Sequence, residues 1–199
     1  MKKIKTFLWK VFSPFANEVW WPMWSNFRWR KALKDHSVAD EHLVKNLTDI
    51  KILVRLLYKG FKWVADDATE LGDSITPPAQ CYKDFCNGLL EDDCDGFHSL
   101  VYHCLAKSGV RCYLMSVVVL GSGHCVLVFE NKGKWYVNDY NKVHNGFATL
   151  KEAVEDYNKI YLTSYNKEDK EVIYNGFTEY NYTTGKFKSV KHQLKKLLK

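Results

Sequence analysis

The stretch LLEDDCDGFHSLVYHCLAKSGVRCYLMSVVV (Leu89–Val119) decides the fold, because its hydrophobic period changes halfway along. Between residues 94 and 107 the apolar residues recur at helical spacing, and Ser108-Gly109 is a typical helix stop. Residues 111–120 are β-branched and aromatic, which is typical of a strand. The stretch therefore predicts a helix that begins at the cysteine of DDCD and leads into a strand.

The segments on either side extend this pattern. Further strands are expected at 124–130, 134–140, 160–165 and 171–182, with turn signals at 121–123 and 131–133. Helices are expected at 4–13 up to Pro14, from a cap at Asp40 to Gly60, after Pro77-Pro78, from the capping box Thr149–Glu152 to about Tyr157, and in the basic C-terminal end, with an irregular aromatic segment at 20–30. This order predicts an α+β fold in which N-terminal helices pack on a mostly antiparallel sheet.

The length and composition indicate one domain with a substantial core. The chain has 199 residues, of which 46% are apolar and 26% are charged. We divide it into a basic, aromatic-rich segment (1–35), a core (36–165) and an extension made of a strand and a basic helix (166–199).

The sequence favours a cytoplasmic protein. Its apolar runs are shorter than the roughly 20 residues of a membrane span, and Lys10 interrupts the apolar start, which argues against a secretion signal. Free cysteines fit a reducing compartment better than a disulfide scaffold in a chain of this length. The six cysteines are Cys81, Cys86, Cys94, Cys104, Cys112 and Cys125.

Charge is divided unevenly along the chain. Residues 1–34 carry eight Lys/Arg and one acid, residues 186–199 carry six lysines and no acid, and the middle is acidic. The basic residues at the two ends are explained if they lie on solvated helix faces. They are also explained if the ends bind a protein partner or an anionic surface. No nucleic-acid-binding motif accompanies the charge, so no specific nucleic acid partner is predicted.

Cys94 is the candidate nucleophile. It lies where the predicted helix begins, so free backbone N–H groups and the positive end of the helix dipole point at its sulfur. The surrounding acids Glu91, Asp92, Asp93 and Asp95 have the opposite effect, because nearby carboxylates raise the pKa of a thiol. A cationic partner is therefore required for reactivity.

His124 and Asp139 are the candidate partners, on two strands of one predicted hairpin. An even-numbered turn puts His124 directly opposite Asp139, with Val126, Val128, Trp135 and Val137 filling the same face, against which the Cys94 helix is expected to pack. An odd turn would bring Tyr140 opposite His124, and Asn138 would then be the fallback orienter.

These residues resemble a known family. DDCDGFHSL, HCVLVFE and KWYVNDY are similar, in order and spacing, to the motifs of the bacterial transglutaminase-like cysteine proteinases, and the likeness covers about residues 55–145. The resemblance implies a papain-like or transglutaminase-like core with Cys94 as nucleophile, His124 as general acid and base, and Asp139 as orienter. It implies cleavage or transfer of a protein or peptide amide through a thioester, with no cofactor or metal.

The sequence departs from the family pattern at several positions. An aspartate replaces the glycine before DCD, Gly96 replaces a second acid, and His98 replaces an alanine. The oxyanion donor has no motif; Gln80 is the candidate chosen from three upstream residues, the others being Trp63 and Tyr82.

Two alternatives remain. His98, four residues after Cys94, is a second possible imidazole partner, or a zinc ligand together with Cys94, Cys81 and Cys86, although the spacing matches no known zinc framework. The protein as a whole is alternatively a catalytically silent binding or assembly protein, for example a component of a phage particle, that uses its aromatic, basic ends.

Overall fold

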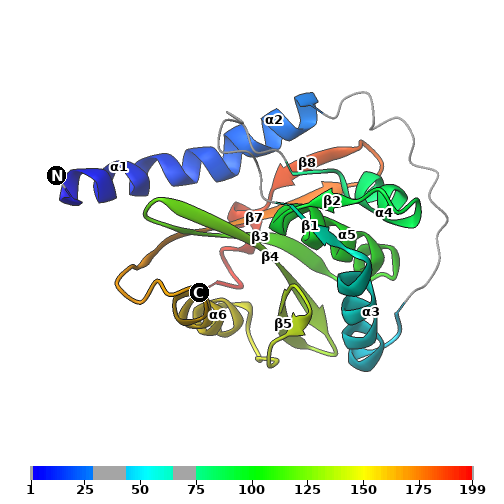
Figure 1. Cartoon of the computed structure of the whole chain (residues 1–199). Coiled ribbons are helices and arrows are strands. Elements are labelled where there is room, and N and C mark those ends of the chain that lie inside the picture. The colour runs from blue at the N-terminus through cyan, green and yellow to red at the C-terminus, as the bar shows by residue number, and fades with distance from the viewer. Residues whose placement is uncertain (1, 29–43, 65–74, 199) are drawn as a thin grey trace.

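A six-stranded antiparallel sheet forms the centre of the computed structural model, which describes residues 2–28, 44–64 and 75–198 (Figure 1). The strand order is β6-β5-β4-β3-β7-β8. The strands are β3 (Cys112–Val119), β4 (Ser122–Asn131), β5 (Lys134–Asp139), β6 (Lys142–Val143), β7 (Val172–Asn181) and β8 (Lys186–Ser189). A separate parallel pair joins β1 (Lys62–Trp63) to β2 (Glu91–Asp92). The predicted α+β class with a mostly antiparallel sheet is confirmed.

Helices cover both faces of the sheet. They are α1 (Lys2–Phe15), the π-helical turn η1 (Ala16–Trp20), α2 (Trp21–Arg28), α3 (Leu47–Gly60), α4 (Pro78–Cys86), α5 (Cys94–Lys107), α6 (Leu150–Ser164) and α7 (Lys191–Leu194). Helix α5 shares one core with Leu114, Leu127 and Phe129, whereas α6 shares the other core with Val126 and Val128. The expectation that the Cys94 helix packs on the Val126 face is therefore wrong, because α6 occupies that face.

The β4–β5 hairpin has the even turn that a shared face for His124 and Asp139 requires. Asn131 pairs with Lys134, and both turn residues, Lys132 and Gly133, have positive φ (51° and 72°), as in a type I′ turn. Leu127 lies opposite Asn138, so His124 and Asp139 are two residues away from direct opposition. The turn therefore has an even number of residues, as the expected His124–Asp139 pair requires. The two residues are diagonal neighbours, however, and not directly opposite each other.

Two expectations for the N-terminal helices are wrong. Pro14 lies inside α1 and is followed at once by η1, which fits the loss of a backbone donor at proline. The aromatic segment after it is helical, as α2. Helix α3 is capped by Asn46, whose side chain accepts from the N–H groups of Thr48 and Asp49; Asp40 lies outside the described residues.

Tertiary packing overrides local preference near the C-terminus. Helix α6 continues through the predicted strand 160–165, because its tyrosines Tyr157 and Tyr161 are buried one turn apart against the sheet. Residues 186–189 pair with β7 as a strand, and only a short α7 follows. Strand β7 also pairs with β3. The C-terminal residues therefore form part of the central sheet.

The continuous helical segment 2–28, which we call the N-terminal helix, turns polar side chains toward the sheet. Asn17 accepts a hydrogen bond from Ser116, and Glu18 accepts one from Tyr174. The side chain of Asn26 exchanges two hydrogen bonds with the backbone of Phe187 (2.8 and 3.0 Å). These contacts fix the helix across β3, β7 and β8.

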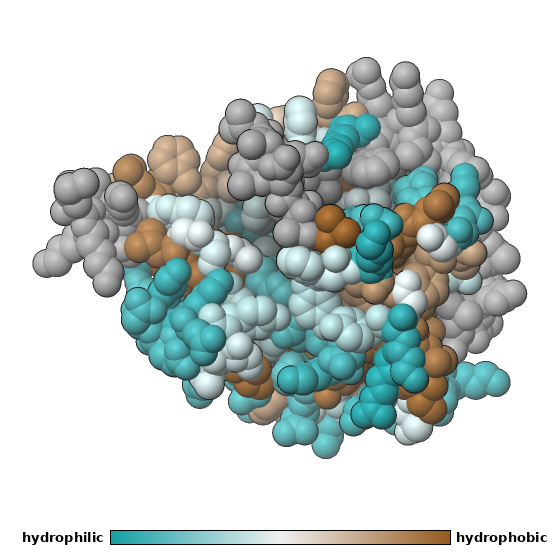
Figure 2. Space-filling model, in the orientation of Figure 1, coloured by the Kyte–Doolittle hydropathy of each residue, from teal (hydrophilic) through white to brown (hydrophobic). Residues whose placement is uncertain are grey.

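Large apolar side chains of the same helix face outward, and Figure 2 shows apolar residues gathered along it. The exposed set comprises Phe7, Leu8, Trp9, Val11, Phe12, Phe15, Val19, Trp20, Met23 and Phe27. Binding of a partner or anionic surface through this segment stays a prediction. Within the described part of the chain, no helix has both the length and the apolar character needed to cross a membrane.

Candidate active site

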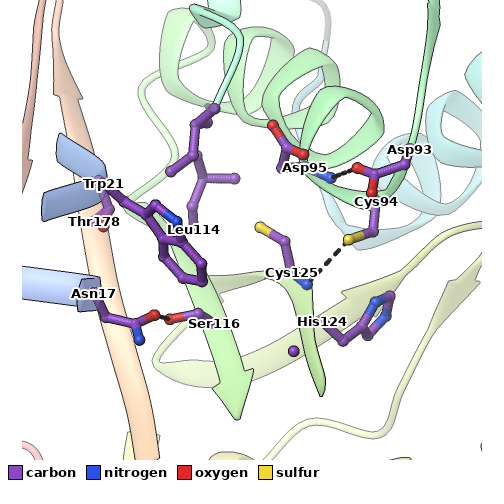
Figure 3. Close-up of a pocket in the computed structure, with 12 residues that line it drawn as sticks. Asn17, Trp21, Asp93, Cys94, Asp95, Leu114, Ser116, His124, Cys125 and Thr178 are labelled. Carbon is purple, nitrogen blue, oxygen red and sulfur yellow. Dashed lines mark hydrogen bonds between the residues drawn. The ribbon is translucent and has the colours of Figure 1, made fainter. Parts of the chain in front are cut away.

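The first turn of α5 holds Cys94 at the end of the sheet. Asp93 caps the helix by accepting a hydrogen bond from the N–H of Asp95 (3.1 Å). The sulfur of Cys94 accepts a hydrogen bond from the backbone N–H of Cys125 (3.3 Å), the residue after His124. Figure 3 shows the thiol and the His124 ring at the same end of β4. The structure thus brings Cys94 and His124 to one place.

Gly96 explains why the helix start lies so close to the acidic strand before it. A side chain at this position would overlap the carboxylate of Asp92. Glycine therefore permits the close approach of Asp92 to α5, at the position where the family has a second acid.

Asp139 binds the imidazole of His124. The Nε2 atom of His124 lies 2.9 Å from Oδ1 of Asp139, and both side chains are buried. Tyr165 is also close, with its hydroxyl 3.1 Å from the same nitrogen. Since Asp139 engages Nε2, the other ring nitrogen, Nδ1, is the one that can serve the thiol.

The carboxylate of Asp139 is strongly stabilised in its charged form. Burial alone would raise its pKa, but the hydrogen bond and charge of His124, the His98 ring and the Tyr157 hydroxyl (2.9 Å) outweigh it and lower the pKa to about 2. Asp139 is therefore ionised throughout the neutral range and fixes the orientation of His124.

The environment of Cys94 disfavours a free thiolate. Burial raises the pKa of its thiol well above the usual value, and the carboxylates of Asp93 and Asp95 raise it further. The hydrogen bond from the Cys125 N–H lowers it, with a smaller effect. The thiol therefore needs a base that takes its proton during attack, which is the role that His124 can fill.

A cavity of about 150 Å³ leads to the thiol (Figure 3). Its residues come from the start of α5, the sheet, the N-terminal helix, and Ile75 in the segment before α4. Asn17 and Trp21 of the N-terminal helix lie across the cavity from His124 in Figure 3. A small acyl group has room beside the thiol.

His98 connects α5 to the end of β5. Its Nδ1 atom lies 2.5 Å from the carbonyl oxygen of Cys94, and its Nε2 accepts a hydrogen bond from the N–H of Tyr140 (3.1 Å). The ring is fully buried, and this burial lowers its pKa to about 4. His98 is therefore a neutral positioning residue, and its occupied nitrogens rule out the role of zinc ligand for this side chain.

We expect His98 to make stability pH-dependent. The folded protein keeps His98 neutral down to about pH 4, whereas an unfolded histidine binds a proton near pH 6.5. The unfolded state therefore holds more protons in this window, and stability falls as pH drops from 6.5 to 4, by about 3 kcal/mol. In denaturant unfolding, His98→Gln is expected to lose that part of the pH dependence.

The matched control for this prediction is His192→Gln, at an exposed position in α7. It should retain the wild-type dependence on pH. Parallel curves for wild type and His98→Gln would contradict the role assigned to His98.

None of the three candidates for the oxyanion donor lines the cavity that leads to the thiol. The amide of Gln80 donates to both carboxylate oxygens of Asp84 (2.8 and 2.9 Å), and Gln80 does not line the cavity. Gln80 is therefore not placed to serve as oxyanion donor. Tyr82 stacks on His103, and the indole of Trp63 donates to the hydroxyl of Tyr140 (3.0 Å).

Asn138, the fallback orienter, holds the turn after β5 rather than the imidazole of His124. Its side-chain amide donates to the carbonyl oxygens of Tyr140 and Lys142. Among the described residues, the group of side chains close enough to hold a metal ion is Asp92, Asp93 and Asp95, and it includes neither His98 nor the two further cysteines of the zinc hypothesis. Cys81 is buried and Cys86 is exposed, and the hydrogen bonds of the His98 ring go to neither of them.

Sequence reasoning missed the tyrosines that surround His124. Tyr157, Tyr161 and Tyr165 recur every four residues on and just after α6; Tyr161 stacks on His124, and the other two contact Asp139. A spacing of four residues indicates one face of a helix, but a strand was predicted at 160–165, so the three tyrosines were not placed on one face. Asn17 and Trp21 carried no signal, since only the tertiary fold brings the N-terminal helix to the cavity.

Comparison with known proteins adds a distant likeness. No protein-family model and no curated protein matches the sequence. One solved structure that matches is a proposed cysteine protease from Cytophaga hutchinsonii, with 10% sequence identity and a TM-score of 0.37. The match covers 65% of this chain but only 41% of that one. A likeness this distant extends at most to the fold, and the chemistry of the site rests on its own geometry.

Proposed function

We propose that this protein is a transglutaminase-like thiol enzyme that cleaves or transfers the acyl group of a protein or peptide amide. One observation carries the proposal: a buried His124–Asp139 pair lies at the end of β4 where the next backbone amide holds the sulfur of Cys94. This arrangement supports Cys94 as nucleophile, His124 as base and Asp139 as orienter of the base.

In the first step the Cys94 sulfur attacks the carbonyl carbon, and an S–C bond forms. The thiol proton passes to Nδ1 of His124. This proton transfer is needed because burial and carboxylates raise the pKa of the thiol. The tetrahedral intermediate then loses the amine: the C–N bond breaks, and His124 gives its proton to the leaving nitrogen. A thioester on Cys94 remains.

In the second step water attacks the thioester, with His124 accepting the proton of the water. The C–S bond breaks, the acid is released and Cys94 regains its proton. An amine in place of water gives transamidation by the same steps.

Asp139 and the start of α5 supply the supporting electrostatics. The ionised Asp139 holds Nε2 of His124 and stabilises the imidazolium that forms in each step. With Gln80 engaged elsewhere, we assign the oxyanion to the backbone N–H of Cys94, which belongs to a first helical turn and has no acceptor within its helix.

The proposal is tested with p-nitrophenyl acetate, which acylates reactive thiols without a specific binding site. We expect a burst of nitrophenol close to one equivalent, and an acetyl group on the peptide that contains Cys94 after acid quench and mass spectrometry. Acetylation of Cys86 to the same extent as Cys94, without a burst, would contradict the proposal.

A further inference from the structure

An apolar groove runs beside the cavity of Cys94. It has a volume of about 600 Å³ and lies between the N-terminal helix and the end of the β3–β4 hairpin. Leu8, Trp9 and Phe12 line one side, and Val118 lines the other. The described residues that line it include none with a charged side chain. Its size is typical of a small-molecule site.

The groove adjoins the cavity. Asn17, Trp21 and Gly123 line both of them, and Gly123 directly precedes His124. The polar groups of Asn17 are already bonded inside the protein, to Ser116 and to the carbonyl oxygen of Ser13. The junction therefore presents no unpaired amide that a polar ligand would have to satisfy.

The direction of the groove points to the acyl half of the substrate. His124 must reach the leaving nitrogen, so the amine lies on the His124 side of the scissile bond. The acyl group then extends away from His124, toward Asn17 and Trp21, which lie across the cavity in Figure 3. The apolar groove begins at those two residues.

The backbone around the groove favours an aliphatic chain over a peptide. Strand β3 is paired on both sides along the groove, with β4 and β7. Strand β4 pairs with β5 only from Leu127 to Asn131, so Gly123 and His124 lie on a part of β4 that β5 does not pair, next to the cavity of Cys94. The apolar walls of the groove are the N-terminal helix, whose backbone is bonded within itself, and Val118 of β3. A peptide lying between these walls would leave its own N–H and C=O groups unpaired, whereas an aliphatic chain has no such groups.

We infer that the acyl donor of the Cys94 reaction carries an aliphatic chain and that the groove lined by Leu8, Trp9, Phe12 and Val118 binds it. This inference rests on the proposed thioester chemistry. It explains why three large side chains remain 38–61% exposed beside the site: an acyl chain would cover them.

The test compares p-nitrophenyl octanoate with p-nitrophenyl acetate below micellar concentration. Each buried methylene contributes about fourfold, and octanoate has six more methylenes than acetate, so we expect octanoyl transfer to Cys94 to be on the order of 10³-fold faster in kcat/KM. Phe12→Asp should lower the octanoyl-to-acetyl ratio by about tenfold. The control is Leu56→Asp on α3, where the side chain is about as exposed as that of Phe12 (58% against 61%). This variant should leave the octanoyl-to-acetyl ratio unchanged.

A second measurement separates failure of the groove from failure of the chemistry. Calorimetric titration of N-octanoylglycinamide into Cys94→Ala protein requires no reaction, and we expect binding that the N-acetyl analogue does not show. A wild-type ratio near one, or no difference in binding between the two ligands, would overturn the inference. Binding to phosphatidylglycerol vesicles without any chain-length preference would also overturn it and make the exposed helix a membrane contact.

Discussion

Replacing Cys94 with alanine is expected to abolish acyl transfer, with kcat/KM falling on the order of 10⁴-fold or more. The sulfur forms the covalent bond in the proposed mechanism, and no second nucleophile is positioned to replace it at the start of α5. The side chain is small and sits in the first helical turn, so the fold should persist. The measurement is amine release from peptide amides, with circular dichroism as the check on folding.

Cys125→Ser provides the sharpest comparison, because Cys125 lines the same cavity. Its contact with the Cys94 sulfur uses the backbone N–H, which the substitution preserves. We therefore expect Cys125→Ser to retain activity within about tenfold of wild type. Loss in Cys125→Ser together with activity in Cys94→Ala would show that the nucleophile is misassigned.

Replacing Asp139 with asparagine is expected to lower kcat by about 10³–10⁴-fold with little change in KM. The carboxylate accepts the hydrogen bond of His124 Nε2, and this bond keeps the proton on Nε2 and Nδ1 available as a base. An asparagine can present its N–H₂ group to Nε2 instead, which places the ring proton on Nδ1. His124 then cannot accept the thiol proton.

Tyr157→Phe is the milder variant to compare with Asp139→Asn. It removes one hydrogen bond to the far oxygen of the carboxylate and leaves the contact with His124 in place. We expect a loss of about tenfold or less. Equal losses in the two variants would indicate that Asp139 acts through packing with α6 rather than through the tautomer of His124.

The helix start and the hairpin were predictable because local signals define them. Cys94 follows a capping aspartate, and the Lys132-Gly133 turn is of a type that glycine favours, so the helix boundary and the parity of the hairpin were both correct. These two features place Cys94 at a helix start and His124 near Asp139, whereas the contact of Cys94 with β4 depends on how α5 packs on the sheet.

The choice of sheet face was not predictable from the sequence pattern. Strands β3 and β4 are apolar on both sides, since Leu127 and Phe129 alternate with Val126 and Val128. With no polar face to mark solvent, periodicity cannot tell which helix covers which side. The pairing of Gln80 with Asp84 is a different case, because the two residues are four apart on α4 and such pairs are neighbours on any helix.

The central claim, that His124 activates Cys94, is tested most directly by the rate of alkylation with iodoacetamide at pH 6–7. Exposed Cys86 serves as the internal reference, and each cysteine is followed by peptide mass spectrometry. Although burial and carboxylates raise the pKa of the Cys94 thiol, we predict that Cys94 reacts faster than Cys86 and that His124→Ala slows it at least 10²-fold. Alkylation of Cys94 at the same rate in wild type and His124→Ala would contradict the claim.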